Sequence, residues 1–135
     1  INRGRSFIYT TAAPPGQAAA LLAALDLLHR ESYRRVRLRE LSFHLAHQLR
    51  ELGWALPPRQ IDTPILPLIV GRPNAALDLS RHLADRGILA PAIRPPTVAP
   101  GTSRIRLSLR ADLNEEHVNR LINALREWRT AEGDR

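Results

Sequence analysis

One stretch of the chain alternates strictly between polar and apolar residues: Arg104-Ile105-Arg106-Leu107-Ser108-Leu109-Arg110. Successive side chains of a β-strand point to opposite faces of the sheet, so this stretch predicts a strand with one apolar face. Its other face carries three arginines and a serine. Continuous apolar runs at 65–70 and 88–93 predict two further strands. Pro67 indicates an edge position or a bulge for the first of them, because proline has no N–H to donate to a neighbouring strand.

Helical patterns precede these strands and alternate with them. Leucines recurring at steps of three and four predict a helix over 33–52. Two further helices are predicted. One lies over 74–86 with Asn74 as its cap, and the other runs from its cap Asn114 onward, with fraying after Arg129. The order of elements indicates an α+β fold, in which helices cover one face of a small three-stranded antiparallel sheet.

The first predicted helix, over 16–29, is unusual because it is apolar almost all round. Such a helix requires burial on several sides, which a small domain can hardly supply. On the helix over 33–52, Val36 and Phe43 lie opposite the leucine stripe. They are either isolated exposed apolar residues or contacts to a partner surface.

Several residue types are absent from the 135 residues, and each absence excludes a class of chemistry. Without cysteine there are no disulfides and no thiolate nucleophiles. All 20 basic residues are arginine, so no Schiff-base or P-loop lysine is present. The chain also lacks methionine and begins at Ile1, which leads us to expect a fragment or processed product. No apolar run is long enough for a membrane span, and the cytoplasm is the expected location.

The net charge of +7 permits binding to nucleic acid through phosphate contacts. Only the segment 33–39 forms a dense arginine cluster, and it has no interleaved aromatic residues for base stacking. A non-catalytic basic domain that binds nucleic acid or a protein through Arg34 to Arg39 therefore remains an alternative. A solvated or inter-domain helix face is the favoured explanation of the cluster.

Two groups of polar residues could carry chemistry. Glu40, His44 and His47 have the helical spacing of metal ligands, although ordinary surface histidines explain the same pattern, and no metal is expected. Arg94 ends a predicted strand and enters a proline-rich loop with Thr97, a suitable place for an arginine fork that binds a carboxylate. A salt-bridged or solvent-facing arginine is the simpler interpretation.

Thr10 and Thr11 precede the Pro14-Pro15 pair. Their hydroxyl groups and backbone donors could hold a phosphate, although a polar pair in a turn is the more common explanation.

Two longer stretches combine these residues into recognisable patterns. The first is Arg5-Ser6-Phe7-Ile8-Tyr9-Thr10-Thr11-Ala12-Ala13-Pro14-Pro15, and the second is Ala92-Ile93-Arg94-Pro95-Pro96-Thr97-Val98-Ala99-Pro100-Gly101-Thr102-Ser103-Arg104-Ile105-Arg106-Leu107. They resemble two signatures of the α-oxoamine synthases, a family of fold-type I pyridoxal-phosphate enzymes. The distance between them and the intervening Pro67-Leu68-Ile69-Val70-Gly71 also fit, so the resemblance covers nearly the whole chain.

The resemblance implies the C-terminal small domain of a pyridoxal-phosphate-dependent homodimer. Residues 1–13 would lead in from a large domain, and residues 14–135 would form the small domain. The Ile-Arg-Pro-Pro-Thr-Val form is most similar to members that condense L-alanine with a pimeloyl thioester, with loss of carbon dioxide, in biotin biosynthesis. A member of the glycine C-acetyltransferase type is the alternative within the family.

The resemblance also implies roles for individual residues. Thr11, with Thr10 beside it, matches a threonine that reaches the cofactor phosphate across the dimer interface. Arg94, with Thr97 beside it, matches an arginine that binds a carboxylate of a substrate or product. The family's catalytic lysine, and the aspartate and histidine that contact the cofactor ring, would lie upstream of Ile1. No catalytic residue is therefore expected in this chain, and alone it is expected to be inactive.

Overall fold

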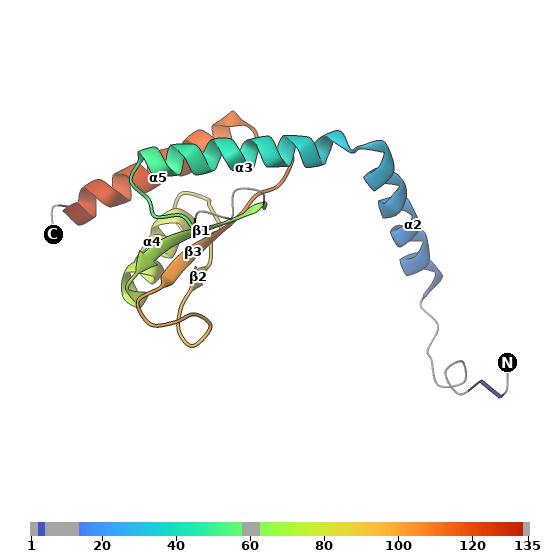
Figure 1. The fold of residues 1–135 in the computed structure, drawn as a ribbon, viewed down its shortest axis with the longest axis horizontal. Coiled ribbons are helices and arrows are strands. Elements are labelled where there is room, and N and C mark those ends of the chain that lie inside the picture. Colours follow the sequence, from blue (N-terminus) through green and yellow to red (C-terminus); the bar gives the residue numbers. More distant parts are fainter. Residues whose placement is uncertain (1–2, 5–13, 58–62, 134–135) are drawn as a thin grey trace. The chain divides into compact units, whose positions relative to one another are not determined.

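The structure, a computed structural model, describes residues 3–4, 14–57 and 63–133. The chain divides into two compact units, Ile1–Tyr33 and Arg34–Arg135, which are considered separately. The elements are α2 (Pro15–Arg30), α3 (Tyr33–Glu51), β1 (Ile65–Gly71), α4 (Pro73–Ala84), β2 (Ala92–Ile93), β3 (Ser103–Ser108) and α5 (Glu115–Gly133) (Figure 1). The predicted small domain, 14–135, spans parts of both units, and its boundary stays a prediction.

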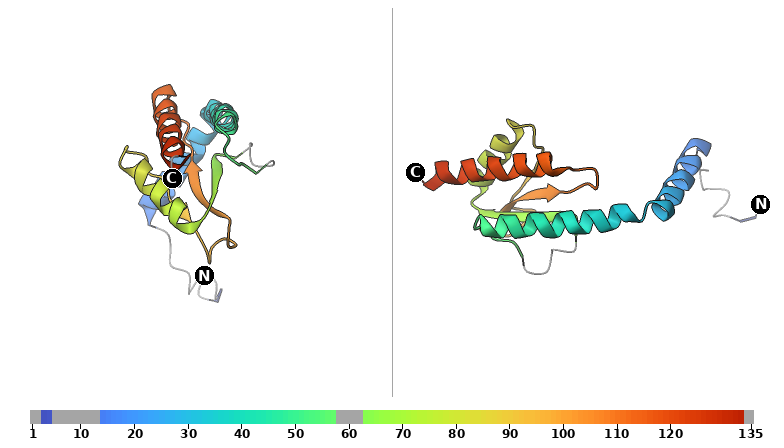
Figure 2. Two further views of the ribbon diagram at one scale, coloured as in Figure 1. Left: turned by 90° about the vertical axis from the view of Figure 1, so that its left-hand side faces the viewer. Right: turned by 90° about the horizontal axis from the view of Figure 1, so that it is seen from above.

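The three strands form one antiparallel sheet in the order β1-β3-β2, which confirms the predicted α+β class. The alternation that predicted β3 is visible in its burial. Ser103, Ile105 and Leu107 are buried, whereas Arg104 is half-buried and Arg106 is exposed. α4 contacts all three strands and also α5, and Figure 2 shows α4 and α5 on one side of the sheet. The opposite face carries the polar side chains of β3 and, paired with them, apolar residues of β1, of which Pro67 is buried.

The hydrophobic core of the second unit lies between this face of the sheet and the helices. The predicted stripes of α3 and α5 both point into it, and Leu45, Leu49 and Leu125 are fully buried. They join apolar residues of β1 and β3 in a single cluster. Burial of one such leucine stabilises a fold by roughly 1.5–3 kcal/mol. Helix positions in this unit are therefore determined by side-chain packing rather than by helix propensity alone.

α3 and α5 run in the same direction and are bridged near both ends (Figures 1 and 2). Near their starts, Arg37 donates a hydrogen bond of 3.2 Å to the carbonyl of Leu113. Near their ends, Trp54 stacks on Trp128 with ring centroids 5.8 Å apart, and the guanidinium of Arg129 lies 5.0 Å from the Trp54 ring centroid. Arg129 also donates to the carbonyl of Leu52.

The outer edge of β1 has its backbone donors removed or occupied. Arg106 donates its N–H to Pro91 on the β2 side, so the facing residue Pro67 points its nitrogen away from β3, toward the edge. Proline has no hydrogen there. The neighbouring outward N–H groups are also engaged, because Ile69 donates to the carbonyl of Ala55 and Ile65 to the Thr63 hydroxyl. The edge position predicted from Pro67 is confirmed.

Some predicted ends of helices and strands differ in the structure. Asn74 is not the cap of α4, which begins at Pro73 after Arg72, because proline fits the first helical turn where its missing N–H has no partner to lose. α5 does not fray after Arg129 but continues to Gly133, since Trp128 and Arg129 are held against the end of α3. The Asn114 cap is confirmed by a 3.1 Å bond from the His117 N–H to its side-chain oxygen.

β2 is shorter than the predicted strand of 88–93 and contains only two residues. Pro91 has no N–H with which to extend the ladder, and the carbonyl of Ala90 instead accepts a 2.7 Å bond from the Ser80 hydroxyl. Leu89, in the middle of the apolar run, is 95% exposed.

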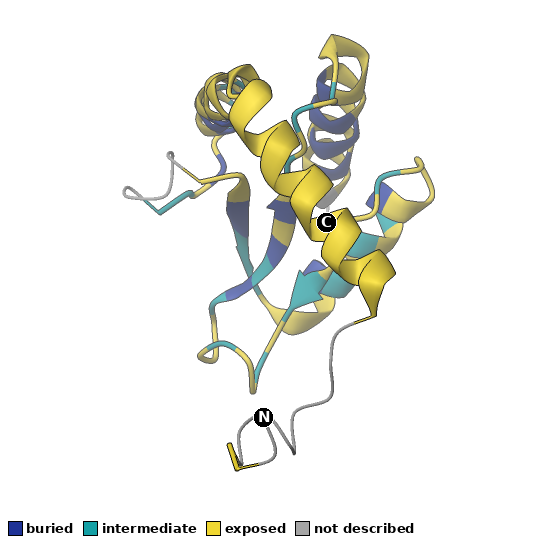
Figure 3. Cartoon of the chain, turned by 90° about the vertical axis from the view of Figure 1, so that its right-hand side faces the viewer, coloured by how far each residue is buried: buried dark blue, intermediate teal, exposed yellow. Residues whose placement is uncertain are grey.

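In the first unit, α2 forms as predicted but buries none of its residues (Figure 3). Leu21 and Leu22 are 66% and 68% exposed. Its polar support is local, with an ion pair between Asp26 and Arg30 one turn apart. We predicted burial on several sides from the apolar surface of α2. Within the described residues, that surface is exposed to solvent.

Candidate functional site

Arg94 directly follows β2, and its position is set by the sheet. The last residue of β2, Ile93, pairs with Arg104 of the central strand β3. The Arg94 side chain is exposed, and it has neither an ion pair nor a hydrogen bond within the part of the chain that the structure describes. A guanidinium with five unused donors at the end of a strand is available for a carboxylate or another planar anion.

The loop after Arg94 is formed by two hydrogen-bonded turns. The N–H of Thr97 donates to the carbonyl of Arg94 over 3.0 Å, and the N–H of Thr102 donates to that of Ala99 over 3.1 Å. Thr97 is exposed, and the structure describes no hydrogen bond from its hydroxyl. The first turn therefore keeps Thr97 beside the backbone of Arg94, with its hydroxyl available to a ligand. A shared site at these two residues stays a prediction.

Arg106 is a second candidate, which the sequence reasoning did not select. It is exposed on the face of the sheet opposite the helices, and its guanidinium has no described ion pair or hydrogen bond. The signal in the sequence was the strict alternation, which assigns three arginines to this face. The alternation alone does not say which of the three has a partner.

The other two arginines of this face have partners. Arg104 donates from Nε to the carbonyl of Thr102 over 3.0 Å. Arg110 makes a bidentate pair with Asp112, with distances of 3.0 and 2.9 Å. The hydrogen bond from Arg110 lowers the pKa of the Asp112 carboxyl below its usual value. Arg110 is thus neutralised by its own neighbour, and the arginines without a partner on this strand and its flanking loop are Arg94 and Arg106.

The two threonines predicted to contact a cofactor phosphate, Thr10 and Thr11, lie outside the described residues. Their role stays a prediction.

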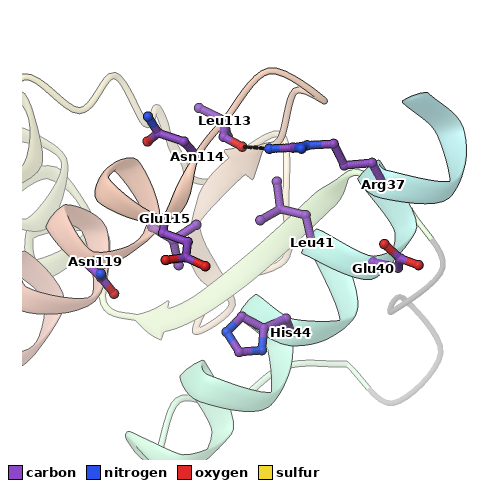
Figure 4. A pocket seen from close by; sticks show the side chains of 9 residues that line it. Arg37, Glu40, Leu41, His44, Leu113, Asn114, Glu115 and Asn119 are labelled. Atoms are coloured by element: carbon purple, nitrogen blue, oxygen red, sulfur yellow. Dashed lines mark hydrogen bonds between the residues drawn. The ribbon is translucent and has the colours of Figure 1, made fainter. Parts of the chain in front are cut away.

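A pocket of about 510 Å³ lies between α3 and the start of α5, and neither Arg94 nor Thr97 lines it (Figure 4). Its lining mixes apolar residues such as Leu41 and Val118 with polar groups such as His44 and Glu115. No group of three histidines or carboxylates in the described ranges could hold a metal ion. Of the three residues with ligand spacing, Glu40 and His44 line this pocket, whereas His47 lies 3.5 Å from Glu51.

The arginine cluster at the start of α3 is already engaged in contacts. Arg37 donates to Leu113, and Arg34, Arg35 and Arg39 also have interaction partners. Among the described helices, none combines the length and apolar character needed to cross a bilayer.

Known proteins resemble this chain over nearly its whole length. The family model described as aminotransferase class I and II matches residues 1–125. The 8-amino-7-oxononanoate synthase of Nitrosomonas europaea is 48% identical over 127 residues, which are 94% of this chain and 32% of that protein. The synthase of the same name from Saccharophagus degradans is 42% identical over the same coverage. The chain thus spans about a third of the length of these curated relatives.

Solved structures agree with the fold. The serine palmitoyltransferase of Sphingomonas wittichii superimposes with a TM-score of 0.80 at 26% identity, over 93% of this chain and 31% of that one. The 8-amino-7-oxononanoate synthase of Francisella tularensis superimposes with a TM-score of 0.78 at 23% identity, over 98% of this chain and 38% of that one. At such identity the second likeness concerns the fold alone.

Proposed function

Because the chain belongs to the aminotransferase class I and II family, we propose that it is the carboxylate-binding C-terminal domain of a pyridoxal-phosphate-dependent α-oxoamine synthase. The observation that carries this proposal is Arg94, which stands without a partner at the end of β2, in the stretch that resembles the family signature.

The reaction we propose is the decarboxylative condensation of L-alanine with a pimeloyl thioester, the 8-amino-7-oxononanoate synthase step of biotin biosynthesis. The Ile93-Arg94-Pro95-Pro96-Thr97-Val98 segment supports this choice, as do curated relatives of that name at 42–48% identity. Another α-oxoamine synthase activity is the alternative, and the fold likeness to a serine palmitoyltransferase is consistent with it.

In this proposal Arg94 binds a carboxylate of the substrate or product. Its fork offers two parallel N–H donors, which fix the plane of the carboxylate as well as its position. The Thr97 hydroxyl supplies a third donor from the same loop. Arg106 adds a second positive charge from the open face of the sheet. Charge-assisted bonds of this kind contribute about 1.5–3 kcal/mol each.

The cofactor itself could not be held covalently by this chain, because the sequence contains no lysine. When bound, pyridoxal phosphate supplies an electron sink for the substrate's carbanion. The described residues suit the substrate's carboxylate rather than the cofactor. The lysine, and the groups that contact the cofactor ring, would come from a large domain, while Thr10 and Thr11 would reach the phosphate of a second subunit.

The proposed partners are therefore that large domain and the second subunit of a homodimer. α2 supports this proposal, because its leucines are exposed all round and a helix of this kind is stable when several sides are covered. The cytoplasm is the proposed location.

The first test replaces Arg94 with alanine in the complete synthase. We expect the KM for the carboxylated substrate to rise roughly tenfold to a hundredfold, which corresponds to the loss of one charge-assisted bond. The affinity for the cofactor should change much less. Steady-state kinetics with L-alanine, glycine and L-serine as competing amino acids would also identify the family member.

Arg50→Ala is the matched control, because Arg50 is an exposed arginine of α3 with no described partner. Arg50→Ala removes the same charge elsewhere, so it should leave KM unchanged if the rise in KM of Arg94→Ala comes from the position of Arg94 rather than from net charge. An unchanged KM in Arg94→Ala would contradict the carboxylate role.

A second test adds pyridoxal phosphate to the isolated chain. Without lysine, no visible absorbance band of a protein-bound imine is expected. Supplying the large domain should produce both the band and alanine-dependent turnover of the thioester. A stable band on the isolated chain would mean that the cofactor is bound in some other way.

A further inference from the structure

The loop that carries Arg94 ends at Thr102, immediately before β3. Thr102 makes two bonds to one acceptor, since its hydroxyl and its N–H donate to the carbonyl of Ala99 over 2.7 and 3.1 Å. Its own carbonyl accepts the 3.0 Å bond from Nε of Arg104. Thr102 is half-buried; its hydroxyl bond to Ala99 is exposed, whereas the bond from Arg104 to its carbonyl is partly shielded from water.

Arg104 connects the two ends of this loop. Its backbone pairs with Ile93, the residue before Arg94, and its side chain holds the carbonyl of Thr102. The loop end also lies close to the end of β1, where a Cβ on Gly71 would stand 3.6 Å from the carbonyl oxygen of Gly101. The loop is therefore fixed to the sheet at both of its ends, and Thr102 provides the fixation at the end farther along the chain from Arg94.

We propose that Thr102 is a positioning residue for Arg94: its hydroxyl closes the second turn of the loop and so keeps the Arg94 fork oriented for its carboxylate. The inference rests on the proposed function, because it assigns Thr102 a role only through Arg94. Without the hydroxyl, the Ala99 carbonyl loses its shorter bond, and the residues between the two turns gain conformations in which Arg94 is misdirected. When the Arg94 fork is less well oriented, it binds the substrate carboxylate more weakly, although no group that touches the substrate has been removed.

The test is the variant Thr102→Val in the complete synthase, which replaces the hydroxyl by a methyl group of similar size. We expect the KM for the carboxylated substrate to rise roughly threefold to tenfold, as for one neutral hydrogen bond, with kcat and cofactor affinity within about twofold of the parent enzyme. Thr102→Ser keeps the hydroxyl and should restore KM. Thr130→Val is the matched control, because the Thr130 hydroxyl also donates to a backbone carbonyl, that of Arg126, but on the surface of α5.

A double-mutant cycle separates positioning from a general structural effect. In the Arg94→Ala background, Thr102→Val should raise KM no further, because its effect passes through Arg94. Additive effects would overturn the inference, as would an unchanged KM in Thr102→Val where Arg94→Ala raises it. If Arg94→Ala itself leaves KM unchanged, the proposed function fails instead.

Arg104→Met gives a second route if Thr102→Val does not fold. It removes the donor to the Thr102 carbonyl but keeps the threonine, and it should raise KM in the same direction. A folded Arg104→Met enzyme with parental KM would contradict the proposed fixation of the loop.

Discussion

Two serines of the second unit are completely buried, yet their hydroxyl groups are in different situations. Ser42 on α3 donates a 2.7 Å bond to the carbonyl of Thr63 and so holds the chain just before β1. Ser103 at the start of β3 has no hydrogen-bond partner within the described residues. A buried hydroxyl contributes stability when it is paired and lowers it when it is not.

Replacing each serine by alanine should therefore change stability in opposite directions. Ser42→Ala is expected to lower the free energy of unfolding by about 1 kcal/mol, and Ser103→Ala to leave it unchanged or raise it by about 1 kcal/mol. Urea denaturation of both variants against the parent chain measures the difference. Equal losses would mean that the Ser103 hydroxyl has a partner after all.

At the same scale, the sequence predicted part of the candidate site. It selected Arg94 and Thr97 because a strand end followed by prolines indicates a stiff loop that presents side chains. It did not select Arg106, since the alternation in β3 assigns Arg104, Arg106 and Arg110 to one face without distinguishing them. Only the folded chain reveals that Arg104 is bound to Thr102 and Arg110 to Asp112.

At the scale of elements, the turn that follows α3 contains a glycine whose conformation and surroundings both matter. Gly53 has φ +76°, and a Cβ added there would stand 2.7 Å from Nη1 of Arg129. Gly87, after α4, has φ +73° but open space around it. The left-handed conformation penalises any Cβ by roughly 1–2 kcal/mol. At Gly53 a Cβ would also displace the guanidinium that bonds to Leu52 and lies near Trp54.

We therefore expect Gly53→Ala to destabilise the chain more than Gly87→Ala does, by about 1 kcal/mol beyond the shared conformational penalty. Thermal or urea unfolding of the two variants gives the difference. Repeating the pair in an Arg129→Ala background is the control, because the excess should then vanish. If it persists, the arginine is not its cause.

The sequence predicted every described helix and strand: α3 and β3 have a hydrophobic period that packing preserves, and β1 and β2 lie in continuous apolar runs. It was wrong about lengths where contacts distant in sequence decide them. β2 is cut short by Pro91 and by the bond from Ser80 to Ala90, and α5 is extended because Trp128 and Arg129 meet the end of α3. The bond from Ser80 to Ala90 spans 10 positions and that from Arg129 to Leu52 spans 77, and local patterns carry no information about either.

At the scale of the whole molecule, all described apolar residues that are buried lie in the second unit. Deletion of residues 1–33 should consequently leave the free energy of unfolding of the remaining chain, measured by urea denaturation, within about 0.5 kcal/mol of the parent, as expected for a surface change. The same deletion should reduce the binding of an apolar dye, because the exposed leucines of α2 are removed. A large loss of stability would contradict the independence of the two units.

The edge of β1 also affects whether copies of this chain can pair through their strands at high concentration. An open strand normally offers its N–H and C=O groups to a strand of another molecule, and repeated pairing of this kind builds fibrils. Here Pro67 has no hydrogen to offer, and the outward N–H groups of Ile65 and Ile69 are engaged within the same molecule. β2, at the other edge, has only two residues. Ordered fibril growth therefore has little to start from at the two described edges of this sheet.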